Sequence, residues 1–479
     1  MARYRASYYN LQLAKNGDET LIFNGITGAL MRAPGALRDD LLPFVGPARS
    51  RQAGTGFSEW QPPVFEEAEL PARLQQRFDA LLDAGIFIAD DIDERDALRR
   101  SYESNRSRAP FFITITTTLD CNMRCYYCYQ KEGELEHMTA ATCDELIAWT
   151  KTQLAERGFP KLYVDWYGGE PMLNQAVIQQ FSEGMIPFCD SNGVKYTASM
   201  ICNGTAWPSD AAAFVRQQRI NSIQFSIDGP ERHHNKRRGL IDGKGGKGRE
   251  ASFHQVMQTV GSLIGATKIY LRINVDPYIG EDCLELIELC RTRGWLARDA
   301  AFFPYLAVIN AMTEHCGFIG KSKKFLDFEA EFDRIQQAFY AELGKYRDER
   351  SLEVVQYFPN RVQINCAAVS HNAMVFGPNG LMYKCGLDVG DHHRAHDGVG
   401  APSRALLDTD VMPADRWEKY DPFTHTRCKE CQYLPVCMGG CPKAQIDGDD
   451  AQIKMQSAFW ENNFDRIILQ YDAAAAGST

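Results

Sequence analysis

Three cysteines lie close together in the segment Cys121-Asn-Met-Arg-Cys125-Tyr-Tyr-Cys128, directly behind an apolar run rich in β-branched residues at 111–118. Thiolates at this spacing can bind one metal cluster. A zinc site or a fully ligated iron-sulfur cube needs a fourth protein ligand, whereas three cysteines on a four-iron cluster leave one iron open to a small molecule. An open iron indicates catalysis rather than storage.

A second group of cysteines lies in the last quarter of the chain. Cys366 is followed by Cys385, and then by Cys428-x2-Cys431-x5-Cys437-x3-Cys441. In all, the chain has fifteen cysteines and no apolar N-terminal signal segment. Because cytosolic reductants keep ordinary thiols reduced, these cysteines are predicted to be metal ligands or redox thiols. The C-x2-C pair alone is also compatible with a zinc knuckle.

The elements that must position the first group alternate between apolar runs and helical patterns from residue 111 to about 312. Six strands are predicted, at 111–118, 162–167, 196–202, 222–227, 268–275 and 302–308. Helices are predicted between them, at 138–157, 174–188, 209–218, 252–264 and 281–293. This rhythm is typical of repeated βα units around a parallel sheet. Polar or glycine residues follow the first four strands, where active groups of such barrels lie.

The first 108 residues contain no cysteine. Strands are predicted at 4–13 and 20–31, with Asn24-Gly25 and Thr27-Gly28 as turn signals. A helix from Pro71 to about Gly85, a short strand at 86–89 and a charged helical linker at 90–108 are predicted to follow. This order is compatible with a winged-helix module, and equally with a structural cap. At the other end of the chain, the apolar spacing predicts a helix from Ala451.

Charge and hydropathy exclude two broad classes of function. The net charge of the 479 residues is -10, which argues against a general nucleic-acid binder because phosphate contacts need concentrated Lys and Arg. No stretch approaches the roughly 20 apolar residues of a membrane span. A cytoplasmic location is therefore expected.

The cysteine segment 121–128 and the later Gly168-Gly169-Glu170-Pro171 resemble the signatures of radical S-adenosylmethionine (SAM) enzymes. The resemblance implies a [4Fe-4S] cluster on Cys121, Cys125 and Cys128, with SAM on its open iron. When reduced, such a cluster cleaves SAM into methionine and a 5'-deoxyadenosyl radical that takes hydrogen from the substrate. It also implies a partial (β/α)6 barrel of the TIM type, and a reductant such as flavodoxin or ferredoxin.

The same resemblance implies the residues that bind SAM. Tyr127 occupies the adenine position, and the loop Gly168, Gly169 and Glu170 the position of the amino group. Asn203 and Ser226 suit the ribose hydroxyls, and Arg238 suits the carboxylate. Asp228 is as suited to capping a turn as to binding the ligand. Asn274 lies on the strand that the family places beside the adenine.

The spacing of the second group, with Gly380 before Cys385, resembles the SPASM domain, an extension of radical SAM enzymes that modify peptides and proteins. The resemblance implies one or two auxiliary iron-sulfur clusters. One would draw on Cys366, Cys385 and Cys441, and the other on Cys428, Cys431 and Cys437. The family pattern adds a later cysteine, but none follows Cys441 here.

The missing ligands leave several alternatives. The second auxiliary cluster could take an oxygen ligand from Asp447, Asp449 or Asp450, or it could keep an open iron. Otherwise it is smaller than a four-iron cube, or absent. The fourth ligand of the first auxiliary cluster would be Cys316 or a substrate thiol, or its fourth iron would stay open.

The proton acceptor of the reaction is a separate question. Sulfatase-maturing relatives often have an aspartate directly after the cysteine that aligns with Cys385. Here Gly386 stands there and Asp388 comes two residues later. Asp388 is the candidate acceptor, although the shift argues against formylglycine chemistry. His392, His393 and His396 follow, as ligands, acid-base groups or solvated side chains.

The expected protein is therefore a radical SAM and SPASM enzyme that cross-links a ribosomally made precursor peptide through a thioether or carbon-carbon bond. The alternatives are a formylglycine-forming enzyme, a non-catalytic iron-sulfur electron carrier and a zinc-stabilised scaffold. The expected parts are a leader-binding N-terminal module at 1–108, the radical SAM barrel at 109–325, the SPASM domain at 326–445 and a helical tail at 446–479.

Overall fold

The chain divides into two compact units in a computed structural model. The structure describes residues 2–15, 18–46, 62–130, 136–241, 249–297, 300–309, 319, 322–326, 328–346, 359–407 and 415–477. One unit consists of 1–109, 357–372 and 414–479, and the other of 110–356 and 373–413. They are called here the split unit and the sheet unit. The predicted SPASM segment, 326–445, is thus shared between the two units.

A nine-stranded sheet forms the centre of the sheet unit, in the order β13-β12-β9-β8-β7-β6-β14-β15-β16. The first six strands in this order and β14 are mutually parallel, whereas β14, β15 and β16 pair antiparallel. Their bounds are β6 Phe111–Thr118, β7 Lys161–Gly168, β8 Lys195–Cys202, β9 Ile220–Ile227, β12 Lys268–Val275, β13 Phe302–Val308, β14 Ala373–Phe376, β15 Leu381–Tyr383 and β16 Asp397–Gly398. All six predicted strands are confirmed.

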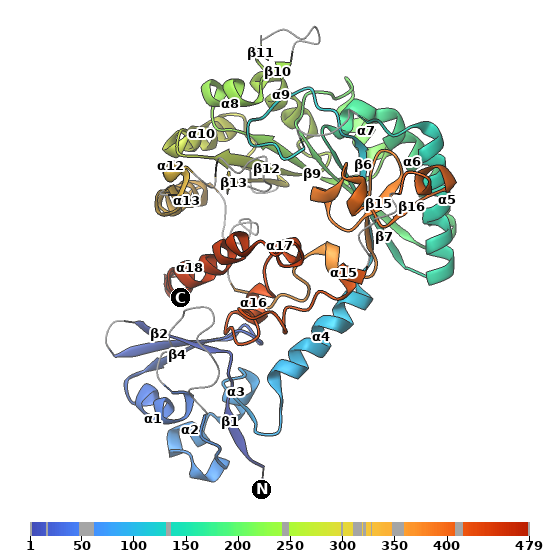
Figure 1. Cartoon of the computed structure of the whole chain (residues 1–479). Helices are drawn as coiled ribbons and strands as arrows, with labels where there is room; N and C mark the ends of the chain where they lie inside the picture. The colour runs from blue at the N-terminus through green and yellow to red at the C-terminus, as the bar shows by residue number, and fades with distance from the viewer. Residues whose placement is uncertain are drawn as a thin grey trace. The chain divides into compact units, whose positions relative to one another are not determined.

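The sheet unit has helices between and after its strands (Figure 1), of which α5, α6, α7, α9, α10 and α13 share the core of the sheet. They are α5 Ala140–Arg157, α6 Gln175–Ser191, α7 Ala211–Gln217, α8 Glu231–Arg238, α9 Phe253–Leu263, α10 Glu285–Thr292, α12 Lys323–Leu326, α13 Phe328–Gly344 and α14 Ala401–Arg404. Local signals fix their ends. In α5, the Thr139 hydroxyl accepts a hydrogen bond from the Thr142 N–H, and Gly158 ends the helix with a φ of +65°.

Short 3-10 helices and one small hairpin complete this unit. They are η2 Pro171–Asn174, η3 Gly280–Leu284, η7 Gly386–Asp388, η8 His392–Arg394 and the hairpin of β10 Leu240–Ile241 with β11 Arg249–Glu250. The predicted helix 281–293 is thus η3 followed by α10. Its apolar residues, including Cys283 and Cys290, belong to the core of the unit.

The split unit begins with two small sheets and three helices. The pair β1 Tyr4–Ala6 with β5 Phe87–Ala89 and the meander β2 Asn10–Lys15, β3 Glu19–Asn24, β4 Leu30–Pro34 are antiparallel. The helices α1 Gly35–Val45, α2 Ala72–Gln75 and α3 Phe78–Asp83, together with η1 Glu67–Glu69, accompany them. The linker is the helix α4 Glu94–Arg108.

The prediction of a single strand at 4–13 is wrong. The chain is not in a strand at the residues between β1 and β2, and these two strands belong to different sheets. The buried Glu94 carboxylate accepts hydrogen bonds from the Ser7 hydroxyl and the Tyr8 N–H there. The Ser7 N–H instead donates to the Ile86 carbonyl. These contacts are long-range, so the local pattern did not reveal the break.

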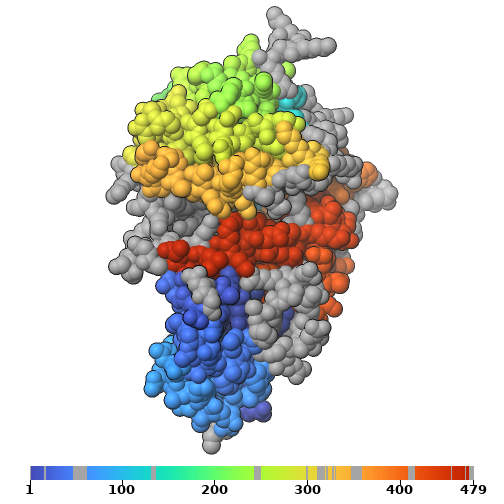
Figure 2. All heavy atoms as spheres, turned by 90° about the vertical axis from the view of Figure 1, so that its left-hand side faces the viewer, coloured from blue at the N-terminus to red at the C-terminus, as the bar shows by residue number. Residues whose placement is uncertain are grey.

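The C-terminal part of the split unit consists of η6 Ala367–Val369, α15 Asp415–Glu418, α16 Leu434–Cys437, α17 Pro442–Asp447 and α18 Asp450–Gly477. Figure 2 shows α18 (red) against the N-terminal strands (blue). Phe464 and Ile468 of α18 share a buried core with Leu11 and Phe23. The ends of the chain thus meet in one hydrophobic core. No helix among the described residues is long and apolar enough to cross a bilayer.

Candidate functional site

The first cysteine group occupies the loop after β6, at the carboxyl end of the parallel strands. The Asp120 carboxylate accepts a hydrogen bond from the Cys121 N–H at 2.8 Å, and the Cys128 N–H donates to the Cys125 carbonyl at 3.1 Å. Cys125 is buried, whereas Cys121 and Cys128 are partly exposed. The loop therefore turns tightly and brings its three cysteines to one edge of the sheet.

The glycines after β7 allow this loop to approach the second strand. A methyl group at Gly168, whose φ is +135°, would lie 2.3 Å from the Thr118 carbonyl oxygen. One at Gly169 would lie 2.2 Å from the Asp120 carbonyl oxygen. Only glycine fits such contacts. Both glycines thus allow the backbone at the end of β7 to lie against the segment that leads into Cys121.

Glu170 joins the second-strand loop to the end of the third strand. Its carboxylate is fully buried and accepts hydrogen bonds from the Met172 N–H at 3.0 Å and the Asn203 N–H at 2.6 Å. Burial raises the pKa of Glu170 to about 7, although these N–H groups and Arg238 lower it. Glu170 therefore fixes the position of Asn203.

Asn203 in turn contacts the cysteine loop. Its side-chain amide donates to the Asn122 carbonyl oxygen at 2.7 Å and lies 3.8 Å from the Cys121 sulfur. Burial, and then the charge of Glu170, raise the pKa of the Cys121 thiol to about 12. The predicted residues of the second and third strand loops are thus joined to the first cysteine by direct contacts.

Four further predicted residues form one buried network around the Tyr127 hydroxyl. This hydroxyl donates to Asp228 Oδ1 at 2.7 Å and accepts from Arg238 at 2.7 Å and Asn274 at 2.9 Å. Asn274 also donates to Asp228 Oδ1 at 3.1 Å. Residues from the cysteine loop, the turn after β9, α8 and β12 therefore converge, although they are spread over 147 positions of the sequence.

Ser226, the remaining predicted SAM contact, lies one residue inside the end of β9. It is half-buried and stands in register with Arg272 of β12. The hydrogen bonds of the Tyr127 network do not include it.

A neighbouring cluster was missed by sequence reasoning. Asp276, fully buried directly after β12, accepts hydrogen bonds from the Tyr126 hydroxyl at 2.6 Å and from Arg237 at 2.6 and 2.7 Å. The signal was present, because Asp276 follows its strand as Asp228 follows β9. The neighbouring residues Arg237 and Arg238 bind different buried groups, because Arg237 donates to Asp276 and Arg238 donates to the Tyr127 hydroxyl.

This arrangement fits a bound polar cofactor in two respects. Within the described residues, Asp228 Oδ2 and Arg238 Nε are buried without a hydrogen-bond partner. Buried polar atoms are normally satisfied, so an acceptor and a donor here are available to a ligand. Three thiols at the adjacent loop supply the donor chemistry of an iron-sulfur cluster.

No group of three or more Cys, His, Asp or Glu side chains among the described residues is arranged to hold a single metal ion. A four-iron cube binds each thiolate through a different iron, so its ligands need not converge on one point.

Comparison with known families identifies the sheet unit. The model of the radical SAM superfamily matches residues 115–290, which run from β6 into α10 and include the cysteine loop. These residues are a radical SAM domain. Enzymes of this superfamily use a [4Fe-4S] cluster and SAM, and the chain is accordingly a radical SAM enzyme.

Two curated relatives are similar in sequence. The chain is 20% identical over 374 residues to the cysteine-type anaerobic sulfatase-maturating enzyme of Clostridium perfringens, covering 73% of this chain and 94% of that protein. It is 22% identical over 189 residues to the sporulation killing factor maturation protein SkfB of Bacillus subtilis, covering 39% of this chain and 41% of SkfB.

A solved structure supports the fold. Native anSMEcpe with bound AdoMet superposes with a TM-score of 0.50 at 18% identity, over 76% of this chain and all of that one.

Cys385 lies in the same unit as the radical SAM domain. It follows β15, in the segment whose strand β14 pairs in parallel with β6. A methyl group at Gly386 would lie 3.6 Å from the Tyr167 ring, and the Tyr167 hydroxyl contacts that of Tyr129. Cys385 therefore lies near the carboxyl end of β7, where Gly168 is also found.

Asp388, the candidate proton acceptor, is buried in η7. Its carboxylate lies 3.6 Å from Arg394, and its N–H donates to the Cys385 carbonyl at 3.1 Å. The ion pair joins η7 to η8.

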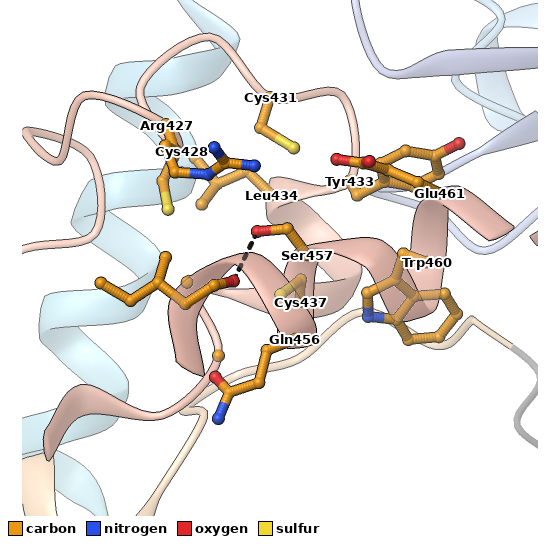
Figure 3. A pocket seen from close by; sticks show the side chains of 13 residues that line it. Arg427, Cys428, Cys431, Tyr433, Leu434, Cys437, Gln456, Ser457, Trp460 and Glu461 are labelled. Carbon is orange, nitrogen blue, oxygen red and sulfur yellow. Dashed lines mark hydrogen bonds between the residues drawn. The ribbon is translucent and has the colours of Figure 1, made fainter. Parts of the chain in front are cut away.

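The split unit gathers Cys428, Cys431 and Cys437 around one pocket (Figure 3). The pocket has an empty volume of about 400 Å³, which includes space that is open to solvent. Gln445 donates towards the Cys428 sulfur at 3.7 Å. Nitrogen donors around a sulfur stabilise its thiolate form and tune the potential of a bound cluster.

The turn after Cys437 is held in an unusual conformation. Met438, Gly439 and Gly440 have φ values of +50°, +87° and +72°. Burial raises the pKa of the Cys437 thiol, while the N–H groups of Gly439 and Gly440 lower it. Consecutive N–H groups that point at one atom form an anion-binding turn, so this backbone partly offsets the effect of burial on the Cys437 thiol.

The other predicted ligands divide between the units. Cys366 and Cys441 are partly exposed in the split unit, whereas Cys385 belongs to the sheet unit. The Asp447 carboxylate pairs with Lys443 at 2.8 Å, and Asp449 accepts the Gln452 N–H at 3.0 Å at the start of α18. Neither lines the pocket, nor does Asp450. Cys316 lies outside the described residues.

Proposed function

We propose that this radical SAM enzyme is a maturase that modifies a ribosomally made peptide, forming a thioether or carbon-carbon cross-link. The observation that carries the proposal is the union of the cysteine loop with the buried Tyr127 network at one end of the parallel sheet. The two relatives named for maturation, of a sulfatase and of the sporulation killing factor, support a polypeptide substrate.

In this proposal each residue has a binding or positioning role. Cys121, Cys125 and Cys128 hold the [4Fe-4S] cluster. When bound, the cluster and SAM supply the 5'-deoxyadenosyl radical that removes hydrogen from the peptide. Arg238 Nε donates to the cofactor and Asp228 Oδ2 accepts from it, because these buried atoms lack partners among the described residues. Tyr127 and Asn274 hold Asp228 in place, and Glu170 holds Asn203.

The remaining parts are also assigned by this proposal. The 1–108 module captures the leader of the precursor peptide, with the edge of its three-stranded sheet as the surface to which an extended peptide adds. The second cysteine group binds auxiliary clusters, and flavodoxin or ferredoxin supplies electrons. Asp388 is the proposed proton acceptor.

The catalytic assignment is tested by replacing Cys121, Cys125 and Cys128 with Ala in the full chain. After anaerobic reconstitution with iron and sulfide, the variant should keep auxiliary-cluster absorption but form no 5'-deoxyadenosine from SAM. Cys143→Ala, at a buried core thiol of α5, should retain both properties. Deoxyadenosine formation by the triple variant would refute the assignment.

A second candidate function is the oxidation of a peptide cysteine or serine to formylglycine. The match to 94% of the sulfatase-maturating enzyme favours it. Mass spectrometry of a panel of cysteine-containing peptides after turnover separates the two. A cross-link removes two hydrogen atoms and keeps the sulfur, whereas formylglycine formation from cysteine replaces the sulfur with oxygen. Retained sulfur is the result expected here.

A further inference from the structure

One face of α18 closes the pocket that contains Cys428, Cys431 and Cys437. The helix contributes Ile453, Gln456, Ser457, Trp460 and Glu461 to the pocket lining. These positions follow the spacing i, i+3, i+4, i+7, i+8 of a single helix face. Any cluster bound by the three thiols therefore lies against this face, and a fourth protein ligand would most directly come from it.

Only one of these five side chains is an acid. Ile453 and Trp460 do not provide an iron ligand. The amide oxygen of Gln456 accepts the Cys441 N–H at 2.6 Å, and the Ser457 hydroxyl donates to the Ile453 carbonyl at 3.0 Å. Glu461 contributes a carboxylate, an oxygen ligand that suits iron.

The position of Glu461 also suits this role. Glu461 lines the same pocket as Cys431 and Tyr433 (Figure 3), and its charge acts on the Cys431 thiol. A carboxylate and a thiolate in one pocket repel each other, and iron bound to both would remove this repulsion. Arg427 lines the same pocket, and its guanidinium lowers the cost of gathering anionic ligands there.

The acids that the sequence offered are placed differently. Asp447 pairs with Lys443 and also lies 3.7 Å from Arg416. Asp449 caps α18, because its side chain accepts the Gln452 N–H. These acids follow Cys441 closely in sequence but do not line the pocket, whereas Glu461 reaches it from about three turns along α18.

We propose that Glu461 is the oxygen ligand that completes the auxiliary cluster on Cys428, Cys431 and Cys437, in the place of the cysteine missing after Cys441. The inference rests on the proposed function, which assigns an auxiliary cluster to these three thiols. The cluster then has a full set of protein ligands and no iron open to small molecules, which suits electron transfer rather than substrate binding.

The test uses the full chain with Cys121, Cys125, Cys128 and Cys366 replaced by Ala, so that the other proposed clusters lose ligands. It is reconstituted with iron and sulfide, reduced, and mixed with ¹⁵N-imidazole as the probe of an open iron. Pulsed paramagnetic resonance detects the nitrogen coupling, and an iron assay follows cluster integrity after mild oxidation. The chain with Glu461 should show no ¹⁵N coupling.

Glu461→Ala should gain that coupling and lose one iron per cluster on oxidation. Glu461→Cys should exclude imidazole and keep all its irons, which also shows that the site still folds. The matched control, Asp449→Asn, should behave like the parent chain. Imidazole coupling in the parent chain, or a Glu461→Ala variant identical to it, would overturn the inference alone. A folded parent chain that binds no iron would overturn the auxiliary cluster as well.

Discussion

At the scale of single residues, the Tyr127 hydroxyl joins Asp228, Arg238 and Asn274 through hydrogen bonds. It lies between Asp228 and Arg238, whose nearest charged atoms are 3.8 Å apart. A buried acid and a buried guanidinium are costly unless each is hydrogen-bonded. Sequence reasoning selected Tyr127, Asp228, Arg238 and Asn274 one at a time, but it did not show that a single hydroxyl joins them.

Tyr127→Phe tests this role. The variant loses three hydrogen bonds to buried polar groups, so SAM affinity should fall by about 1–3 kcal/mol, roughly 5- to 150-fold. Equilibrium SAM binding to the reconstituted enzyme measures the change. Tyr270→Phe, at a half-buried tyrosine of β12 that contacts Phe303, should leave it unaltered. Equal affinities in all three proteins would mean that the network does not serve the cofactor.

His396 provides a prediction of pH dependence. Burial, and then the charge of Lys384, lower the pKa of His396 to about 4, against about 6.5 in an unfolded chain. The unfolded state therefore binds a proton first as the pH falls, and stability decreases from pH 6.5 towards pH 4. Between pH 7 and pH 5 this residue should cost about 1–2 kcal/mol.

Denaturant unfolding of the parent chain and of His396→Gln at both pH values measures this cost. The variant should lose less stability on acidification, by about that amount. His393→Gln, at an exposed histidine of η8, should follow the parent chain. An identical acid response of the parent and His396→Gln would show that His396 is not the responsible group.

At the scale of elements, local patterns predicted the strands well but not the contacts between their ends. The strands β6, β12 and β13 have the predicted bounds, because buried parallel strands are continuous apolar runs. The helix α8 was not predicted, since its sequence from Glu231 to Arg238 is strongly polar. Its helical form is supported by hydrogen bonds from Arg237 and Arg238 to residues far away in the sequence, which a short stretch of sequence cannot reveal.

Gly169→Ala tests the close approach of β7 to the cysteine loop. The new methyl group would meet the Asp120 carbonyl, so the variant should lose about 3 kcal/mol of stability or more and bind the catalytic cluster poorly. Gly193→Ala is the matched control, because its φ of +66° strains alanine but nothing lies within 4 Å. It should cost about 1 kcal/mol.

Thermal unfolding and the visible absorption of the reconstituted proteins provide the two readouts. If Gly169→Ala were no worse than Gly193→Ala in both, the close packing of these two loops would not matter for the site.

At the scale of the whole molecule, the sequence predicted consecutive domains, whereas the split unit is assembled from three separate stretches. Arg106 of α4 links them. Its buried guanidinium donates to the carbonyls of Val369 at 2.8 Å, Trp417 at 3.0 Å and Glu418 at 3.3 Å. A basic residue near a helix end is usually read as a charge that complements the helix dipole. Its partners more than 260 positions away could not be foreseen.

Arg106→Lys should destabilise the split unit by about 2–3 kcal/mol, because an ammonium cannot span three separated carbonyls as a guanidinium does. Hydrogen exchange should then accelerate in α4 and α15 but not in the strands of the sheet unit. Arg100→Lys, at an exposed arginine paired with Asp96, should change the free energy of opening measured by hydrogen exchange by less than about 0.5 kcal/mol. Uniform acceleration in both units would contradict the role of Arg106.

The joining of the two chain ends in one core has a consequence for biosynthesis. Chains emerge from the ribosome N-terminus first, and early domains usually fold while later ones are still being made. Here every residue of the sheet unit precedes residue 414, whereas Leu11 and Phe23 pack against Phe464 and Ile468, which are translated after the whole sheet unit. The sheet unit can therefore close during translation before the core partners of the N-terminal strands have been made. A nascent chain stalled before residue 450 should leave these strands open to protease and the sheet unit protected.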